Sequence, residues 1–544
     1  MITLEIDAKR TAVKSGESVF ECAERVGVFI PTSCSKQGKC RECLVEVAEG
    51  MEYLSARSPE ESHLKGNYRL SCRARMGSDQ GLIRCHTMRR SAIHIEENAA
   101  GLPDINDLEP AVRRDGKRIL LDGQPIAVAD GPLYGVAVDV GTTTVVLKLI
   151  DLETGKHVAT QSFENPQRFG GSDVMARICY DGQHKERLLQ RALLGYLGHA
   201  IKALPCNPLT IYEMVIAGNA TMRDIVFGFP VQTIGQAPYR SITEHDMREG
   251  KRSTTTVEVK AARLRLPIHP EARVLGLPLI SGHVGADAAA CMLAIDLMNE
   301  ERQVALMDIG TNTELLVGNR HRIFAASCPA GPAFEGGLIT CGMPALEGAI
   351  ERVRIRDDAS VEYRVIAGGE PMGICGSGLV DVLSELRRTE RMNELGRFQE
   401  GEQDVVLDRE HNIVLSENDV SQLAQAKAAN MAGLTLTLQK YGIDYANLDC
   451  FYLAGGFARH LDINAARRIG LIPNLPDHKI VQVGNASIHG AVIALKSLSH
   501  RRQLEKLVRE VTHVELEAIP HFIDVFVEAC QFNPINSSVL AETV

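Results

Sequence analysis

The stretch YGVAVDVGTTTVVLKLID (residues 134–151) reads as an apolar strand, an Asp-x-Gly-Thr-x-Thr turn and a second apolar strand. The same pattern returns in VALMDIGTNTELLVG (304–318). Each copy is followed by a further strand that ends in a glycine turn, namely EMVIAGNATM (213–222) and CFYLAGGFARH (450–460). Two copies of the same order indicate duplication of an α/β unit.

The two Asp-Gly-Thr turns have the composition of a phosphate site. Each would bring backbone N–H groups and hydroxyls to one point, with a carboxylate behind them. Phosphate oxygens accept from such donors, and Mg²⁺ takes the carboxylate. Two loops, one in each half, can face each other across a cleft and hold a triphosphate from both sides. The alternative is that they are ordinary glycine-rich turns of an α/β protein.

This pattern resembles the actin, sugar kinase and Hsp70 superfamily, so the expected fold is a duplicated α/β, ribonuclease H-like ATPase core. The resemblance implies binding of ATP and Mg²⁺. Segments 281–296 and 484–497 look like its two connecting helices, which cross closely because they are built from small residues. The implied nucleotide-binding residues are Gly141, Thr142 and Thr143 in the first loop, Gly310, Thr311 and Asn312 in the second, and Gly455 and Gly456 in the adenosine motif.

The same resemblance implies three catalytic carboxylates. Asp139 and Asp308 open the two phosphate loops, and Asp287 begins the first connecting helix, where a polar group helps to place the attacking water. Loop one lacks the double glycine of many kinases. No G-x-G-x-x-G follows a strand with an acidic residue at the right distance, so a dinucleotide-dependent reductase is not supported.

Near the N-terminus, CSKQGKCREC (34–43) and Cys72 together give the spacing C-x5-C-x2-C-x28-C. A zinc site usually has two short-spaced ligand pairs, whereas here the fourth cysteine stands alone. A [2Fe-2S] cluster uses three thiolates from one loop and a fourth from a distant strand. Zinc and unliganded thiols remain the alternatives. Gly38 is suited to a loop position with positive φ. The predicted ligands are Cys34, Cys40, Cys43 and Cys72.

The cysteine-rich module resembles a [2Fe-2S] ferredoxin of the plant and adrenodoxin type, which implies an α+β, β-grasp domain. Five basic residues flank its cysteines: Lys36, Lys39, Arg41, Arg73 and Arg75. They form either a solvated rim or a docking surface for an acidic redox partner. Other cysteines are interpreted as packing residues: Cys22, Cys85, Cys179, Cys206, Cys291, Cys450 and Cys530.

Composition narrows the class of protein. The chain has 544 residues, 45% of them hydrophobic and 24% charged, as in a soluble protein. The net charge of -10 argues against a nucleic-acid partner. Residues 1–95 carry +3, so the remainder carries -13. No signal peptide and no run of 18 apolar residues are present, which favours a cytoplasmic protein without a membrane partner.

Four regions follow from these patterns. Residues 1–95 form the ferredoxin-type domain, and 96–133 a linker or small accessory subdomain. The first half of the ATPase spans 134–300, and the second half 301–544.

Three further glycine-containing segments remain after these assignments. Residues 327–350 are interpreted as a mobile loop beside the second phosphate site, with Glu335 near the γ-phosphate, rather than a metal site built on Cys328 and Cys341. Residues 165–178 are expected to line the cleft. GICGSGLVD (373–381) either contributes to the cleft or packs tightly.

The whole arrangement is similar to the reductive activators of corrinoid proteins. The resemblance implies a role in anaerobic methyl transfer, where the cluster supplies one electron to reduce Co(II) to Co(I) and ATP drives the step. It implies a corrinoid protein as partner, with an acidic docking surface, and an upstream electron donor, and it leaves a homodimer open. The alternatives are an ATP-driven electron donor to another low-potential enzyme and a redox-sensing kinase or chaperone-like ATPase.

Overall fold

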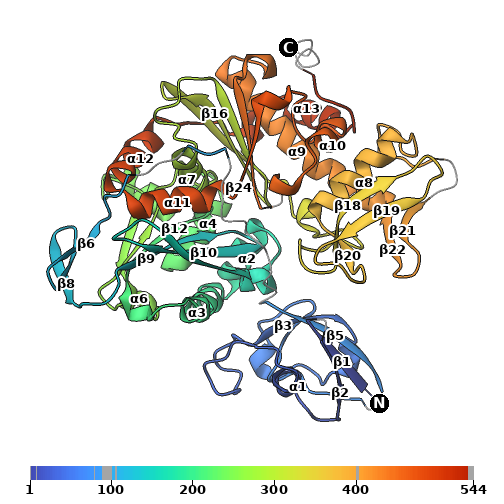
Figure 1. Ribbon diagram of the computed structural model, residues 1–544, viewed down its shortest axis with the longest axis horizontal. Helices are drawn as coiled ribbons and strands as arrows, with labels where there is room; N and C mark the ends of the chain where they lie inside the picture. Colours follow the sequence, from blue (N-terminus) through green and yellow to red (C-terminus); the bar gives the residue numbers. More distant parts are fainter. Residues whose placement is uncertain are drawn as a thin grey trace.

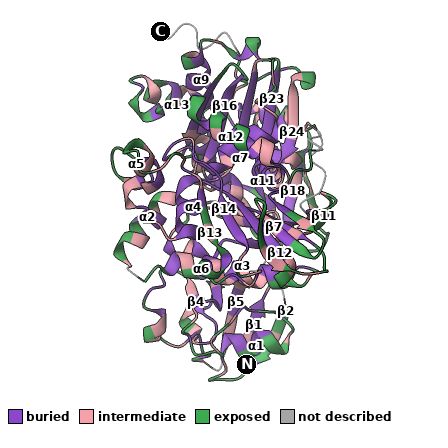
Figure 2. Ribbon diagram, turned by 90° about the vertical axis from the view of Figure 1, so that its left-hand side faces the viewer, coloured by how far each residue is buried: buried purple, intermediate pink, exposed green. Residues whose placement is uncertain are grey.

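The computed structural model describes residues 2–7, 9–78, 80–88, 101–103, 107–184, 186–399, 403–456 and 458–536. Figure 1 shows an N-terminal domain, in blue, that lies below two larger lobes. The strands of both lobes and of the N-terminal domain are largely buried (Figure 2). Among the described residues, no helix is both long enough and apolar enough to cross a bilayer.

The N-terminal domain is a five-stranded mixed sheet with one helix. Strand order is β2-β1-β5-β3-β4, and β1 pairs parallel to β5 while the other pairs are antiparallel. The helix begins at Ser18, which forms a capping box with Glu21. This sheet confirms the expected α+β class. The elements are β1 (Ile2–Ile6), β2 (Lys9–Val13), α1 (Val19–Arg25), β3 (Leu44–Glu49), β4 (Tyr68–Leu70) and β5 (Gly81–Thr87).

A small antiparallel sheet lies in the stretch expected to be a linker or accessory subdomain. It consists of β6 (Val112–Asp115), β7 (Arg118–Leu121) and β8 (Gln124–Val128), in that order. Residues 89–100 and 104–106 of the same stretch lie outside the described residues. In Figure 1 the sheet projects from the side of the first lobe.

The first lobe is built on a six-stranded sheet of order β11-β10-β9-β12-β14-β13. Strands β9 and β12 pair parallel, as do β12 and β14. Its elements are β9 (Tyr134–Val140), β10 (Thr144–Asp151), β11 (His157–Glu164), α2 (Val174–Gln183), α3 (Leu188–Lys202), β12 (Ile211–Ala217), α4 (Ala220–Phe227), α5 (Ile242–Arg248), β13 (Val257–Lys260), α6 (Ala261–Leu264), β14 (Arg273–Gly276) and α7 (Ala286–Ala294).

The second lobe is built on a sheet of order β24-β23-β15-β16-β17-β25, with further small sheets of β18 to β20 and of β21 and β22. Its elements are β15 (Val304–Asp308), β16 (Thr313–Asn319), β17 (Arg322–Cys328), β18 (Ala349–Ile355), β19 (Val361–Val365), β20 (Gly373–Ile374), α8 (Gly376–Arg388), β21 (Asp404–Asp408), β22 (Ile413–Ser416), α9 (Glu417–Tyr441), β23 (Cys450–Ala454), α10 (Ile463–Arg468), β24 (Ile480–Gly484), β25 (Thr512–His513) and α13 (Phe522–Ala529). The same half of the chain supplies α11 (Ala486–Lys496) and α12 (Leu498–Glu510), which pack on the first lobe.

The two large sheets repeat one topology. In each, three antiparallel strands are followed by two parallel ones, so β11-β10-β9-β12-β14 corresponds to β17-β16-β15-β23-β24. This confirms the duplicated α/β core. Helices α7 and α11 lie between the lobes (Figure 1). They cross so closely that a Cβ on Gly490 would lie 1.8 Å from the carbonyl oxygen of Ala290.

The isolated cysteines are less uniformly buried than the sequence predicted. Cys22, Cys85, Cys291 and Cys450 are buried, whereas Cys206 and Cys530 are half-buried. The prediction is wrong for Cys179, whose side chain is exposed. An apolar neighbourhood in sequence does not decide which face of a short helix such as α2 a residue occupies.

The segment GICGSGLVD serves close packing. A Cβ on Gly378 would lie 2.3 Å from the carbonyl oxygen of Ile350, so only glycine lets α8 approach β18 this closely. Cys328 is buried at the end of β17, against Gly433 of α9. Within the described residues, no group of three or more His, Cys, Asp or Glu side chains is placed to hold a single metal ion.

Candidate functional site

The four clustered cysteines lie as two pairs. The Sγ atoms of Cys43 and Cys72 are 3.3 Å apart and buried. Cys34 and Cys40 form a second pair, in which the two thiols interact directly. A zinc ion requires all four sulfurs around one point, whereas each iron of a [2Fe-2S] cluster takes two thiolates. The paired arrangement therefore fits two irons rather than one ion.

The loop that carries three of these cysteines has an unusual backbone. Gly38 has φ 74°, as the sequence predicted, and Ser35, Lys36 and Arg41 also have positive φ. For non-glycine residues this conformation costs about 1–2 kcal/mol each. Such a loop turns its N–H groups inward, which suits the binding of an anionic cluster.

The pKa values of the thiols reflect these N–H groups. Burial raises the pKa of Cys34, but backbone N–H groups of Cys40, Gln37 and Lys39 outweigh it and lower the pKa to about 7. The neighbouring Cys43 thiol lowers the pKa of Cys72, and its own pKa is raised by that contact and by burial. Iron is bound by thiolates, so the loop favours the ligand form at Cys34 and Cys72.

The basic residues around the cysteines are partly engaged within the domain. Lys36 forms an ion pair with Glu24. Arg73 donates to the carbonyl of Gln37 and lies 3.4 Å from Glu60, and Arg75 donates to the carbonyl of Gly16. Lys39 remains exposed.

The cysteine loop is docked on helix α3 of the first lobe. Glu42 lies 3.0 Å from Nε2 of His199 and also accepts from Ser33. Arg191 donates to the carbonyl of Lys39 at 3.4 Å. Gly195 leaves room for this approach, because a Cβ there would lie 2.9 Å from Cγ of Glu42. The cluster domain therefore rests directly on the ATPase core.

The two predicted phosphate loops meet between the lobes. The hydroxyls of Thr143 and Thr311 lie 3.2 Å apart, and both donate to the same oxygen of Glu335 at 2.6 Å. Glu335 lies in a single helical turn, Ala333–Glu335, within the glycine-rich segment of the second lobe. The sequence placed Glu335 beside the second loop, and the structure places it against both.

Four carboxylates lie behind these loops: Glu314 is buried, and Asp139, Asp287 and Asp308 are half-buried. Burial and the negative charge of Asp139 raise the pKa of Asp308 to about 7. Burial, together with the charges of Asp139 and Asp308, raises the pKa of Asp287 to about 7. Glu314 on β16 is also buried, and its pKa is raised well above the usual range by burial and by Asp287. Buried acids that repel one another are the chemistry of a cation site.

Asp139 and the two glycines of the adenosine motif lie beside these carboxylates and loops. Asp139 accepts from Asn485 at 2.8 Å and from Ser487 at 2.9 Å, both at the start of α11. Gly455 lies against the second loop, because a Cβ there would be 2.3 Å from the carbonyl of Ile309. Gly456, by contrast, has open space around it. This agrees with a glycine turn that lets a nucleotide approach the backbone.

The first phosphate loop is held from behind by three donors. Asn165 donates to the carbonyls of Gly141 and Thr143, and Arg177 donates to the carbonyl of Thr142. With its carbonyls fixed in this direction, the loop can turn N–H groups toward a phosphate.

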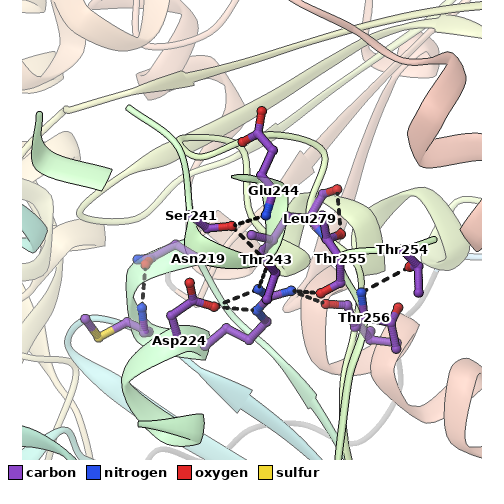
Figure 3. A network of polar contacts seen from close by, with 12 residues as sticks. Asn219, Asp224, Ser241, Thr243, Glu244, Thr254, Thr255, Thr256 and Leu279 are labelled. Carbon is purple, nitrogen blue, oxygen red and sulfur yellow. Dashed lines mark hydrogen bonds and ion pairs between the residues drawn. The ribbon is translucent and has the colours of Figure 1, made fainter. Parts of the chain in front are cut away.

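A buried polar network fixes helix α4 beside the same loop (Figure 3). Asn219 caps the helix and donates to the Thr142 hydroxyl at 3.3 Å. Arg223 forms a buried ion pair with Asp224 and donates to the Thr243 hydroxyl. The network gives the loop a rigid support.

Sequence reasoning missed several of these residues. Glu314 has no counterpart in the first half, where Val145 follows the loop, so the duplication does not reveal it. Asn485 and Ser487 lie in a segment interpreted only as a connecting helix, and Arg177 in one expected only to line the cleft. Asn485, directly before α11, is a capping signal that could have marked that helix start.

Comparisons with known proteins agree with this geometry. Residues 2–77 match the model of a 2Fe-2S iron-sulfur cluster binding domain. Residues 134–300 match the RACo middle region, and residues 302–543 match the C-terminal domain of RACo, the ASKHA domain.

Two curated proteins and one solved structure are similar to the chain. The corrinoid activation enzyme RamQ of Eubacterium limosum is 27% identical, over 97% of both chains. The [Co(II) methylated amine-specific corrinoid protein] reductase of Methanosarcina barkeri is 25% identical, over 65% of this chain and 68% of its own. The structure of a reductive activator for a corrinoid, iron-sulfur protein is 27% identical and covers 98% of both chains, with a TM-score of 0.71.

Proposed function

Because this chain belongs to the RACo family, in which a 2Fe-2S domain is joined to an ASKHA ATPase core, we propose that it is an ATP-dependent reductive activator of a corrinoid protein. The substrate is the corrinoid cobalt of a partner protein, which gains one electron and changes from Co(II) to Co(I). The names of its two curated relatives and of its structural relative support this choice of substrate. The observation that carries the proposal is the docking of the loop that bears Cys34, Cys40 and Cys43 on a two-lobed core with mutually repelling carboxylates between its lobes.

Cys34, Cys40, Cys43 and Cys72 would hold the [2Fe-2S] cluster, two thiolates to each iron. Such a cluster would supply one electron at a time to the corrinoid, and an upstream electron donor would be needed to reduce it again. Backbone N–H groups of the loop stabilise the thiolates, among them those of Gln37 and Lys39 at Cys34 and that of Gly38 at Cys72. Cys85 is buried in β5 and takes no part.

The need for ATP follows from redox energies. Clusters of the plant type have potentials near roughly -400 mV. An acceptor about 200 mV lower would cost on the order of 5 kcal/mol for one electron, since 59 mV corresponds to about 1.4 kcal/mol. Closure of a two-lobed core on a nucleotide can offset a cost of this size through differential binding of the partner.

Asp139, Asp287 and Asp308 are the proposed Mg²⁺-associated carboxylates. The charge of Asp139 acts on both Asp287 and Asp308, so the three carboxylates lie near one another behind the phosphate loops and repel one another, although they do not form a preformed single-ion site among the described residues. A divalent cation would relieve that repulsion and leave them ionised. Gly141, Thr142 and Thr143 would contact the phosphates from the first lobe, Gly310, Thr311 and Asn312 from the second, and Gly455 and Gly456 the nucleoside.

The charge of the ferredoxin-type domain favours an acidic partner. Lys39 is exposed beside the cysteine loop, and the ferredoxin-type domain is the basic part of an acidic chain. We therefore expect the corrinoid protein to present an acidic surface to it. Since Lys36 and Arg73 already have partners within the domain, charge steering by this surface will be modest.

The test is an anaerobic reduction assay. The cluster-loaded protein is mixed with a Co(II) corrinoid protein and a low-potential reductant, and Co(I) is followed by its absorbance with and without MgATP. Formation of Co(I) only with MgATP is the expected result. If several corrinoid proteins give no Co(I) although the cluster is intact and ATP is hydrolysed, the acceptor is of another class and the proposal fails.

A further inference from the structure

Helix α2 and the turn before it, Pro166–Gly170, contact both the first phosphate loop and the ferredoxin-type domain. The contact to the loop is made by Arg177 and the contact to the domain by Tyr180. These two residues are three positions apart in one helix, so they lie on the same face, one turn from each other. A single rigid element therefore joins the nucleotide site to the cluster domain.

The contact on the nucleotide side is tight. The Arg177 guanidinium is fully buried and donates to the Thr142 carbonyl at 2.6 Å, to the Gly171 carbonyl at 3.0 Å and to Gln167 at 3.3 Å. A buried donor that loses its acceptor is left desolvated without compensation, which is strongly unfavourable. A shift of the phosphate loop must therefore carry Arg177, and with it α2.

The contact on the ferredoxin side is equally specific. The Tyr180 hydroxyl donates to the carbonyl of His63 at 2.8 Å, and Phe169 packs edge-on against both rings, with centroids 5.8 Å from His63 and 5.5 Å from Tyr180. His63 follows the turn Pro59–Glu61, which is bound to the strand leading to Cys72.

The turn Pro59–Glu61 also contacts the cysteine loop. Glu61 forms a buried ion pair with Arg69 of β4, and Glu60 meets Arg73, which donates to the carbonyl of Gln37 in that loop. The path from Thr142 to the cysteine loop thus consists of direct contacts between packed groups, and it crosses from the first lobe to the ferredoxin-type domain at Tyr180 and His63.

We propose that Arg177 and Tyr180 are positioning residues through which nucleotide binding loosens the docked ferredoxin-type domain. This inference rests on the proposed function, in which the cluster transfers an electron to a partner. The cysteine loop packs on α3 in the docked state and must be released to reach that partner. When a phosphate accepts hydrogen bonds from the N–H groups of the first loop, the loop shifts, and Arg177 moves with the Thr142 carbonyl to which it donates. The turn of helix that carries Tyr180 then moves away from His63.

The experiment is hydrogen–deuterium exchange on the cluster-loaded full chain, with oxidised cluster, with and without Mg²⁺ and a non-hydrolysable ATP analogue. In the wild type, amides in residues 58–72 should exchange about fivefold faster with the analogue, the lower end of typical coupling between sites. In Tyr180→Phe they should exchange fast in both conditions. By reciprocity, Tyr180→Phe should also bind the analogue more tightly, by the same factor.

Tyr445→Phe is the matched control. It removes another buried tyrosine hydrogen bond, to Thr435 at 2.6 Å, in the second lobe. It should keep the wild-type exchange response, and both variants should keep the cluster absorbance. The inference is overturned if residues 58–72 do not respond in the wild type, or if Tyr180→Phe responds as the wild type does. The corrinoid assay decides the proposed function separately, because the exchange response needs no corrinoid.

Discussion

The hydroxyl of Thr143 lies 3.2 Å from the hydroxyl of Thr311, although the two residues come from opposite halves of the duplicated core. Both hydroxyls donate to one carboxylate oxygen of Glu335. A carboxylate thus lies where the two phosphate loops meet, and it makes the contacts that an anion between the loops would make. A nucleotide phosphate must compete with it for these donors.

Replacing Glu335 with glutamine should tighten nucleotide binding. The amide keeps the shape and one acceptor but loses the negative charge that opposes a phosphate. We expect Glu335→Gln to bind the Mg²⁺ complex of an ATP analogue about tenfold more tightly, equivalent to about 1.4 kcal/mol. Isothermal titration calorimetry measures the difference.

The control for Glu335→Gln is Glu362→Gln. Glu362 lies on β19 and forms an exposed ion pair with Arg356, and the substitution removes its charge. It should leave the affinity for the analogue unchanged. Weaker binding by Glu335→Gln would show instead that the carboxylate helps to hold the nucleotide complex.

Asp308→Asn should raise the stability of the protein and lower its activity. The carboxylates of Asp308 and Asp139 are half-buried and repel each other in the absence of a cation. Removing one charge should raise the stability of the nucleotide-free protein by about 1–2 kcal/mol at pH 8, seen as a higher melting temperature. The same change should reduce ATP-dependent Co(I) formation about 100-fold or more, because a proposed Mg²⁺ contact is lost. Full ATP-dependent reduction by this variant would refute the role of the second loop.

Cys43→Ala should abolish electron transfer without affecting the nucleotide site. Its thiol pairs with that of Cys72, so the loss of one ligand leaves an iron with three sulfurs at most. We expect the iron content and visible absorbance of the cluster to disappear while the affinity for MgATP stays the same. Cys85→Ala is the control, since Cys85 is buried in β5 outside the loop, and it should keep the cluster.

The sequence predicted the parts that depend on local pattern. The Asp-x-Gly-Thr-x-Thr repeat identified two strand–turn–strand units, and the structure forms β9 and β10 around one and β15 and β16 around the other. The small-residue segments predicted the close crossing of α7 and α11, which Gly490 makes possible. These features are encoded within a few consecutive residues.

Contacts between distant segments could not be predicted in the same way. Glu42 and His199 are 157 positions apart, and Tyr180 and His63 are 117 apart. Each is a common residue type without a motif around it. The burial of Glu314 is hidden for a similar reason, because an acidic residue in a strand is usually exposed.

The docking of the ferredoxin-type domain should weaken in acid. Burial, and next the positive charge of Arg41, lower the pKa of His63 to about 4 from its ordinary value near 6.5. His184 acts in the same direction, while the backbone of Glu60 and the charge of Glu61 oppose it. Phe169 and His184 of the first lobe supply part of this burial and charge, so undocking raises the pKa of His63. The docked state therefore binds fewer protons than the undocked state, and docking weakens as the pH falls from about 6.5 toward 4.

Small-angle X-ray scattering between pH 7 and pH 5 measures this loss as an increase in the radius of gyration. His63→Gln cannot be protonated and should show a smaller increase. If the two proteins expand equally over this range, another group controls the docking.

Gly490→Ala tests whether the close crossing of α7 and α11 is needed for coupling between the lobes. The added Cβ would lie 1.8 Å from the Ala290 carbonyl oxygen, so the two helices must separate. Overpacking of this kind costs about 1–3 kcal/mol, which differential scanning calorimetry would detect as a lower melting temperature. ATP-dependent reduction should fall more than the cluster content, because the carboxylates between the lobes move apart.

Gly198→Ala is the control. Gly198 lies inside α3, and its added Cβ would make an ordinary 3.6 Å contact with Pro267, so the substitution should stabilise that helix. Equal melting temperatures for the two variants would contradict the proposed crossing.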